Sequence, residues 1–209
     1  MRMPAVARAE PVAEHRWTAR KVLVGGAAAL AAAVLLTVVI GLATSKRVSG
    51  ASMRPTLRSG DRVLVDKSAY HRRGPGRFEV AAMHAPGVAG VAYRRVVGLP
   101  GDRVQIRAVN GEQQVLIQSG GRGVWYSMVT GHHVDWGGPC CDSDGSATGT
   151  AAVTVPAGEY FVLGDNPTAS RDSRAFGFVP RSRLVGRVSV RVWPPGVVGG
   201  RPRLVPLAG

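Results

Sequence analysis

Serine, arginine and aspartate side chains gather in three short stretches of the chain that lie far apart in sequence. The first stretch, residues 49–67, reads SGASMRPTLRSGDRVLVDK and holds Ser52 in a turn of small residues. The second, residues 93–104, reads YRRVVGLPGDRV, and the third, residues 164–180, reads GDNPTASRDSRAFGFVP. A serine in such a turn can expose its hydroxyl as a nucleophile and offer nearby backbone N–H groups to an oxyanion. Taken alone this signal is weak, because most serines in small-residue turns are structural.

The polar residues of the third stretch follow an apolar run, so they must satisfy one another or serve a site. Asp172 with either Arg174 or Arg95 is therefore expected to form an ion-paired buttress. Asp61 and Asp102 each follow a glycine and are interpreted as turn residues.

From residue 48 onward the chain alternates short apolar runs with Gly, Pro and Asn, which is typical of strands joined by turns. Eight runs have the length of strands: DRVLVDK, FEVAAM, YRRVVGL, DRVQIRAV, QQVLIQS, AAVTVPAG, EYFVLGD and VSVRVW. Asn110 and Gly111 lie between two of these runs and predict a β-hairpin. The Gly-rich segment around 119–150 is expected to be an insertion or long loop rather than core. The sequence therefore predicts a mainly β body over residues 46–209.

Cys140 and Cys141, the two cysteines of the chain, are adjacent within the Gly-rich segment. The Cα separation that disulfides prefer exceeds the roughly 3.8 Å step between neighbouring residues, so free thiols or an intermolecular bond are expected. His132 and His133 precede the cysteines, but this spacing fits no zinc-finger or zinc-ribbon pattern. A flexible loop with incidental ligands is therefore the favoured interpretation of these four residues.

Residues 22–45 form an uncharged, mostly apolar run. A helix of this length reaches about 36 Å, which exceeds the roughly 30 Å hydrocarbon core of a bilayer, so we expect a single transmembrane helix. A cleaved export signal is the alternative, but its apolar core is usually only about 7 to 15 residues long. Basic residues are denser before the run than just after it, which places residues 1–21 in the cytoplasm and residues 46–209 outside the membrane.

The chain is strongly basic, with a formal net charge of +14 at pH 7. All but three of its 27 basic residues are arginine. No aromatic RNA-binding motif, zinc-finger spacing or run of Lys and Arg accompanies this charge, so nucleic acid is not an expected partner. A basic face beside anionic lipid headgroups is the interpretation that we favour.

The three stretches together resemble, in order and wording, the bacterial type I signal peptidases, membrane-anchored serine endopeptidases that remove signal peptides from exported proteins. The resemblance covers nearly all of residues 49–195. SMRPTL is similar to the nucleophile box of the family, RRVVGLPGD to the box that carries the general base, GDNPTASRDSR to the last signature, and VRVWPP to the final strand. The resemblance implies an antiparallel β domain at the outer face of the cytoplasmic membrane, which acts on signal peptides without a metal or cofactor.

By this resemblance Ser52 is the nucleophile, and its own backbone N–H contributes to the oxyanion hole. Ser170 matches the family serine whose hydroxyl orients the general base. Asp172 and Arg174 match the supporting acidic and basic residues of the last signature, and Arg95 matches the arginine next to the base.

The chain departs from the family at Arg94, where the family has a lysine whose neutral amine accepts the serine proton. A guanidinium stays protonated, with a pKa above about 12, so arginine cannot simply replace that base. One interpretation is an impaired homologue that still binds signal peptides or partner peptidases. Another is that His84 or His71 serves as the base. Recruitment of Lys67 is disfavoured, because the family places this position on a strand away from the base.

Two further interpretations stay open. Arg94 could be a buried structural cation that is paired with Asp165 or Asp172. The related self-cleaving repressor proteases share the Ser-Lys chemistry, but this chain has an expected membrane anchor and no segment typical of DNA binding.

Overall fold

A computed structural model describes residues 13–131, 134–137, 140 and 151–207 of the chain. The chain divides into two compact units, Met1–Ala43 and Thr44–Gly209. The long helix α1 (Ala13–Thr44) holds one stretch, Lys21–Gly41, that is long and apolar enough to cross a membrane. The predicted N-terminal apolar helix is therefore present. The predicted cytoplasmic segment 1–21 lies largely outside the described residues.

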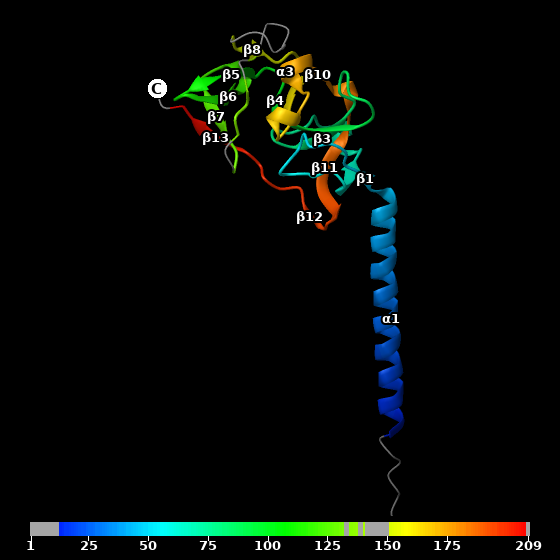
Figure 1. The fold of residues 1–209 in the computed structure, drawn as a ribbon. Helices are drawn as coiled ribbons and strands as arrows, with labels where there is room; N and C mark the ends of the chain where they lie inside the picture. Colours follow the sequence, from blue (N-terminus) through cyan, green and yellow to red (C-terminus); the bar gives the residue numbers. More distant parts are fainter. Residues whose placement is uncertain (1–12, 132–133, 138–139, 141–150, 208–209) are drawn as a thin grey trace, which may run out of the picture. The chain divides into compact units, whose positions relative to one another are not determined.

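The second unit is built from two antiparallel sheets (Figure 1). The larger sheet has the strand order β1-β2-β11-β3-β4-β9-β10, with β12 paired to β11. The strands of this sheet are β1 (Lys46–Arg47), β2 (Arg62–Asp66), β11 (Leu184–Trp193), β3 (Val80–Met83), β4 (Ala92–Gly98), β9 (Glu159–Leu163), β10 (Val179–Pro180) and β12 (Gly196–Val197). The smaller sheet has the order β13-β7-β6-β5-β8, formed by β13 (Arg203–Pro206), β7 (Tyr126–Val129), β6 (Glu112–Gln118), β5 (Arg103–Val109) and β8 (Val153–Thr154).

Short helical turns join the strands. They are α2 (Ala69–Arg72), α3 (Ser173–Phe176) and three 3₁₀ turns, Ser119–Gly121, Pro167–Ala169 and Arg181–Arg183. The mainly β, antiparallel fold predicted from the sequence is confirmed, because every strand pairing is antiparallel.

Each of the eight predicted runs contributes a strand, and the predicted turns are found where the sequence placed them. Strands β5 and β6 form the predicted hairpin, with Asn110 and Gly111 at φ 52° and 83°. Two consecutive positive φ values are what a tight hairpin turn requires, and Asn-Gly supplies them at low cost. Asp61 and Asp102 each accept a hydrogen bond from the backbone N–H three residues earlier, at 2.9 and 2.6 Å, so both are turn residues.

The Gly-rich segment 119–150 differs from its prediction. It contributes strand β7, and Met128, Trp136 and Cys140 are buried in the core that the two sheets share. The expectation that this segment lies outside the core is therefore wrong for these residues, because their apolar side chains cover the face of the smaller sheet. His132 and His133 lie outside the described residues.

The expectation of free thiols is also wrong. Cys140 is disulfide-bonded, and the only other cysteine in the sequence is Cys141, which lies outside the described residues. The preference of disulfides for a larger Cα separation disfavours a bond between neighbours but does not forbid it. Cys140 is fully buried and pairs through its backbone with Ile106 of β5, so its sulfur is part of a packed structure.

Strand β4 lies in the interior of the larger sheet, and all seven of its residues are buried. Two of them, Arg94 and Arg95, carry charges. A buried charge is costly unless hydrogen bonds or opposite charges surround it, so the partners of these two arginines determine what the site can do.

Candidate active site

Ser52 lies in a turn between β1 and β2 that is fixed by buried neighbours. Met53 and Leu57 are buried in the core, and the backbone N–H of Leu57 donates to the Met53 carbonyl at 2.8 Å. Gly50 has a φ of 84°, a conformation that other residues rarely adopt, so the chain can reverse just before the serine. Ser52 itself stays half-buried, with its hydroxyl directed at β4.

The side chain of Arg94 reaches Ser52. Its Nη1 donates to Ser52 Oγ at 2.8 Å and to the Tyr93 carbonyl at 2.6 Å. Its Nε and Nη2 both donate to the carbonyl oxygen of Arg171, at 3.1 and 2.7 Å. The structure therefore brings together the predicted nucleophile and the residue at the position of the general base.

Arg94 is only 4% exposed and takes part in no ion pair among the described residues. The interpretation that it pairs with Asp165 or Asp172 is wrong, because other arginines take up both carboxylates. Burial lowers the pKa of the Arg94 guanidinium below its ordinary value. The charge of Asp172 acts against this lowering of the pKa, and that of Arg174 adds to it.

Arg95 binds the third stretch to β4. Its Nε and Nη2 donate to the two carboxylate oxygens of Asp165 at 2.7 and 2.5 Å. Its Nη1 donates to the Phe78 carbonyl at 2.8 Å, and Nη2 also reaches Thr56 Oγ1 at 3.3 Å. Thr56 belongs to the nucleophile turn, so a single guanidinium contacts the segments from all three polar stretches. The two-point contact with a carboxylate is strong and directional.

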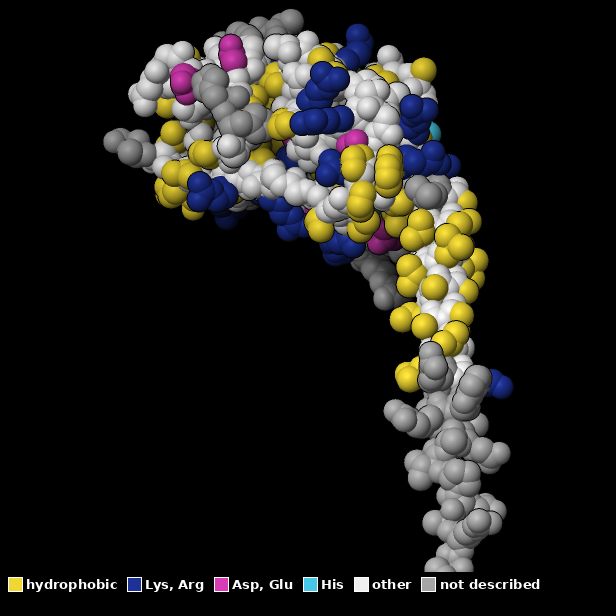
Figure 2. All heavy atoms as spheres, turned by 60° about the horizontal axis from the view of Figure 1, so that its bottom comes forward, with side chains coloured by type: hydrophobic (Ala, Val, Ile, Leu, Met, Phe, Trp, Pro, Cys, Tyr) yellow, Lys and Arg dark blue, Asp and Glu magenta, His cyan; other side chains and the backbone are white. Residues whose placement is uncertain are grey.

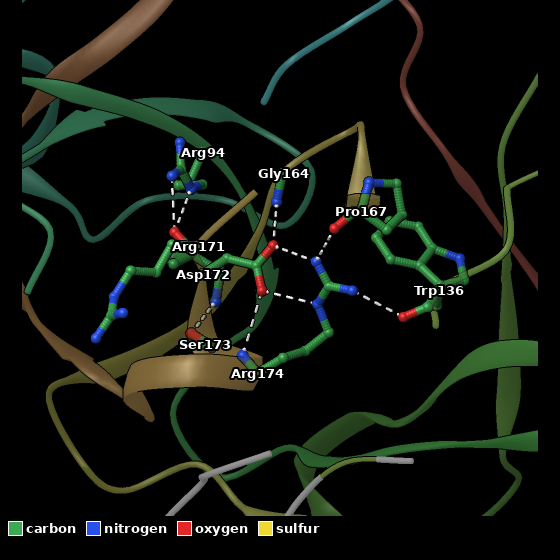
Figure 3. Close-up of polar contacts among 9 residues, drawn as sticks. Arg94, Trp136, Gly164, Pro167, Arg171, Asp172, Ser173 and Arg174 are labelled. Atoms are coloured by element: carbon green, nitrogen blue, oxygen red, sulfur yellow. Dashed lines mark hydrogen bonds and ion pairs between the residues drawn. The ribbon is translucent and has the colours of Figure 1, made fainter. Parts of the chain in front are cut away.

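Asp172 and Arg174 form the centre of a second network, which Figure 3 shows. Asp172 is fully buried, and its oxygens accept from the Gly164 N–H at 2.9 Å and from Arg174 Nε and Nη2 at 2.9 and 3.0 Å. The guanidinium of Arg174 also donates to the carbonyls of Trp136 and Pro167 at 2.8 and 2.9 Å. Of the two partners predicted for Asp172, Arg174 is therefore correct. This pair joins the end of β9 to the segment that carries Trp136.

The third stretch also contacts the nucleophile turn directly. Asn166 donates from its backbone N–H to the Ser52 carbonyl at 2.9 Å and from Nδ2 to the Ala51 carbonyl at 3.2 Å. Gly164 lies close to both Ser170 and the nucleophile turn. A Cβ added at this glycine would clash with Ser170 Oγ and would lie within 2.6 Å of the Ser52 carbonyl oxygen. Ser170 Oγ is buried and has no hydrogen-bond partner within the described part of the chain.

The other basic residues that the sequence offered do not contact Ser52. His84 is exposed and lies three residues along the chain from Ala81, which pairs with Arg94. His71 and Lys67 are exposed on and before α2. Within the described ranges no hydrogen bond joins any of these side chains to Ser52, and no group of three or more potential His, Cys, Asp or Glu metal ligands is found.

Sequence reasoning missed the partners that hold the site by their main chain. The carbonyls of Tyr93 and Arg171, which fix the Arg94 guanidinium, carry no side-chain signal. Asn166 lies in the third stretch, and its role could have been predicted, because an amide side chain that follows a buried strand needs hydrogen-bond partners.

Comparisons with known proteins indicate the family of this chain. A family model described as signal peptidase, peptidase S26, matches residues 20–193. The chain is 32% identical over 164 residues to a probable signal peptidase I-2 of Synechocystis sp.. The alignment covers 76% of this chain and 66% of that protein, so the chain spans about two thirds of that relative. It is 32% identical over 173 residues to signal peptidase IB of Staphylococcus aureus, with 79% of this chain and 86% of that protein covered.

A crystal structure of a signal peptidase I from Enterococcus faecalis matches with a TM-score of 0.39 and 28% identity, over 55% of this chain and 97% of that one. The family and the names of the relatives support a signal peptidase function and give no support to an impaired homologue. Because the family model spans most of the sequence, including all three polar stretches, this chain belongs to the signal peptidase family, peptidase S26.

Proposed function

We propose that this chain is a serine endopeptidase that removes signal peptides from exported preproteins, with Ser52 as the nucleophile. The observation that carries the proposal is the 2.8 Å hydrogen bond between Ser52 Oγ and the side chain at position 94. The backbone N–H of Ser52 donates to no acceptor among the described residues, as an oxyanion donor must before a substrate arrives. Arg95, Asp172 and Arg174 are positioning residues in this proposal, whereas Ser170, whose hydroxyl has no partner among the described residues, would orient a lysine at position 94.

Arg94 sets the pH at which such an enzyme works. When Ser52 attacks the scissile carbonyl, its hydroxyl proton must pass to an acceptor, and a protonated guanidinium cannot take it. Burial lowers the pKa of Arg94, which increases the fraction of neutral guanidine at any given pH. Cleavage is therefore slow at neutral pH and becomes faster as the pH rises.

The proposed location is the cytoplasmic membrane, with residues 1–21 inside and the β unit outside. The one candidate span among the described residues and the charge before it support this orientation. Arg47, Arg54 and Arg58 are exposed on the β unit, and Figure 2 shows Lys and Arg side chains distributed over one of its faces. Anionic lipid headgroups are the partners that such a face attracts.

The test is cleavage of a purified preprotein by the full chain in detergent, followed from pH 7 to pH 10. Ser52→Ala is expected to abolish cleavage, whereas Ser49→Ala, an exposed serine of the same stretch, is expected to leave it unchanged. Cleavage by Ser52→Ala at the parent rate would overturn the assignment of the nucleophile. If the parent cuts at no pH and Arg94→Lys does cut, the chain is a peptidase that has lost its activity.

A further inference from the structure

Arg94 differs from Arg95 and Arg174 because no carboxylate of the described residues forms an ion pair with it. Arg95 has Asp165 as its partner, and Arg174 has Asp172. The four hydrogen bonds of the Arg94 guanidinium go only to neutral oxygens, one hydroxyl and two backbone carbonyls. A buried cation without a counterion is costly, and that cost falls when an anion enters the site.

The nucleophile turn and Ser170 hold hydrogen-bond donors that have no acceptor among the described residues. Ser52 Oγ accepts from Arg94, so the Ser52 O–H proton is left to donate to another group. The Ser52 backbone N–H has no acceptor within the described ranges, and Ser170 Oγ is buried there without a partner. Gly164 touches both Ser170 Oγ and the Ser52 carbonyl, so the two serines lie on the same side of this glycine. The donors and the positive charge together suit a planar anion with two oxygens.

We propose that this site binds the C-terminal carboxylate of a peptide, and specifically that of the signal peptide released by cleavage. The inference rests on the proposed function only for the identity of that peptide. The carboxylate would take the place of the missing counterion of Arg94.

The chemistry of hydrolysis places the carboxylate at Arg94. Water attacks the acyl carbon of the Ser52 ester, the bond from that carbon to Ser52 Oγ breaks, Ser52 regains a proton, and the acid that forms loses its own proton to solvent. The attacking water comes from the side of the base, which here is position 94, while the other oxygen lies at the Ser52 N–H. A neutral lysine would offer that product no charge, whereas Arg94 at neutral pH offers a positive one.

The test compares two synthetic peptides with the same signal-peptide sequence ending in Ala-Xaa-Ala, one with a free carboxylate and one with a C-terminal amide. Binding to the full chain in detergent is measured by calorimetry at pH 7. We expect the carboxylate to bind about 10- to 100-fold more tightly than the amide, the range typical of a hydrogen-bonded charge pair. Arg94→Met is expected to remove this preference. Arg107→Ala, which removes an exposed charge on β5, is expected to keep it.

Equal affinity of the two peptides for the parent would overturn the inference, and so would a preference that survives in Arg94→Met. Circular dichroism and melting temperature establish that Arg94→Met is folded. If that variant does not fold, the same comparison is made in the presence of acetate, which is expected to weaken carboxylate binding to the parent and leave amide binding unchanged. Failure of the proposed function is seen separately, as the absence of preprotein cleavage, and leaves the preference for the carboxylate intact.

Discussion

Replacing Arg94 by lysine changes how readily the side chain beside Ser52 gives up its proton. An ordinary guanidinium has a pKa above about 12, so a neutral guanidine at pH 7 costs about 7 kcal/mol. Burial lowers the pKa of Arg94 and reduces this cost, but the same burial acts on a lysine. Enzymes bring a buried catalytic lysine to a pKa of about 7 or 8, where the neutral amine costs at most about 1.4 kcal/mol at pH 7.

A lysine at position 94 is expected to approach the serine. Lysine is one atom shorter than arginine, so its Nζ takes roughly the place of the guanidinium carbon of Arg94. That carbon lies between Nη1, which is 2.8 Å from Ser52 Oγ, and Nη2, which is 2.7 Å from the Arg171 carbonyl. A positioned general base contributes about 100- to 10,000-fold to a rate. We therefore expect Arg94→Lys to raise kcat/KM at pH 7 by about 100-fold or more over the parent.

The assay is the cleavage of one preprotein by the parent and by Arg94→Lys, in the same detergent and at pH 7. Arg95→Lys is the matched control, because it makes the same exchange at the next residue of β4, where the side chain faces Asp165 and not the nucleophile. This control is expected to gain nothing. A folded Arg94→Lys protein that cleaves no faster than the parent would refute the reasoning, since the proton of Ser52 would then leave by another path.

Three further predictions follow from the same contacts. The cleavage rate of the parent should rise from pH 7 to pH 10, because the fraction of neutral guanidine at Arg94 rises with pH, whereas the rate of Arg94→Lys should level off. A flat profile for the parent contradicts this. Ser170→Ala should leave the kcat of the parent nearly unchanged, because Ser170 Oγ has no partner among the described residues. In the Arg94→Lys background the same change should lower kcat about tenfold, which is the worth of one hydrogen bond. Asp172→Asn should lower the free energy of unfolding by about 3 to 5 kcal/mol in urea, because Arg174 is left without its counterion, and a loss below about 1 kcal/mol would count against the network.

The fold was largely predictable because its signals are local. Alternating apolar runs mark the strands, and Asn110 with Gly111 specifies a hairpin turn that needs two positive φ values. The burial of Trp136 and Cys140 was not predictable in this way. A Gly-rich segment has no periodicity to indicate which of its few apolar residues pack on a sheet that is formed elsewhere in the chain.

The part of the site that was predictable is the set of side chains that match the sequence pattern of the family. That pattern predicted Ser52 beside Arg94 and Asp172 beside Arg174, and both contacts are present. It did not predict the backbone carbonyls that hold the Arg94 guanidinium, because every residue carries a carbonyl and only the folded chain selects which one points inward. The proposed pairing of Arg94 with Asp165 or Asp172 failed for a related reason. Adjacent arginines on one strand point to opposite faces, so Arg95 and not Arg94 reaches Asp165, while Asp172 is bound by Arg174 from its own segment.

The substitution at position 94 therefore changes the protonation of the site and leaves its architecture in place. The bonds from Arg95 to Asp165 and from Arg174 to Asp172 tie the same segments together whether position 94 carries arginine or lysine, because neither pair uses that side chain. Arg94 itself is held by main-chain carbonyls, which accept from an ammonium as well as from a guanidinium. What differs is the charge that remains beside Ser52 at pH 7. A cation beside Ser52 hinders removal of the serine proton and favours a bound carboxylate, so the slow turnover at neutral pH and the retention of the product that we propose both originate in the same side chain.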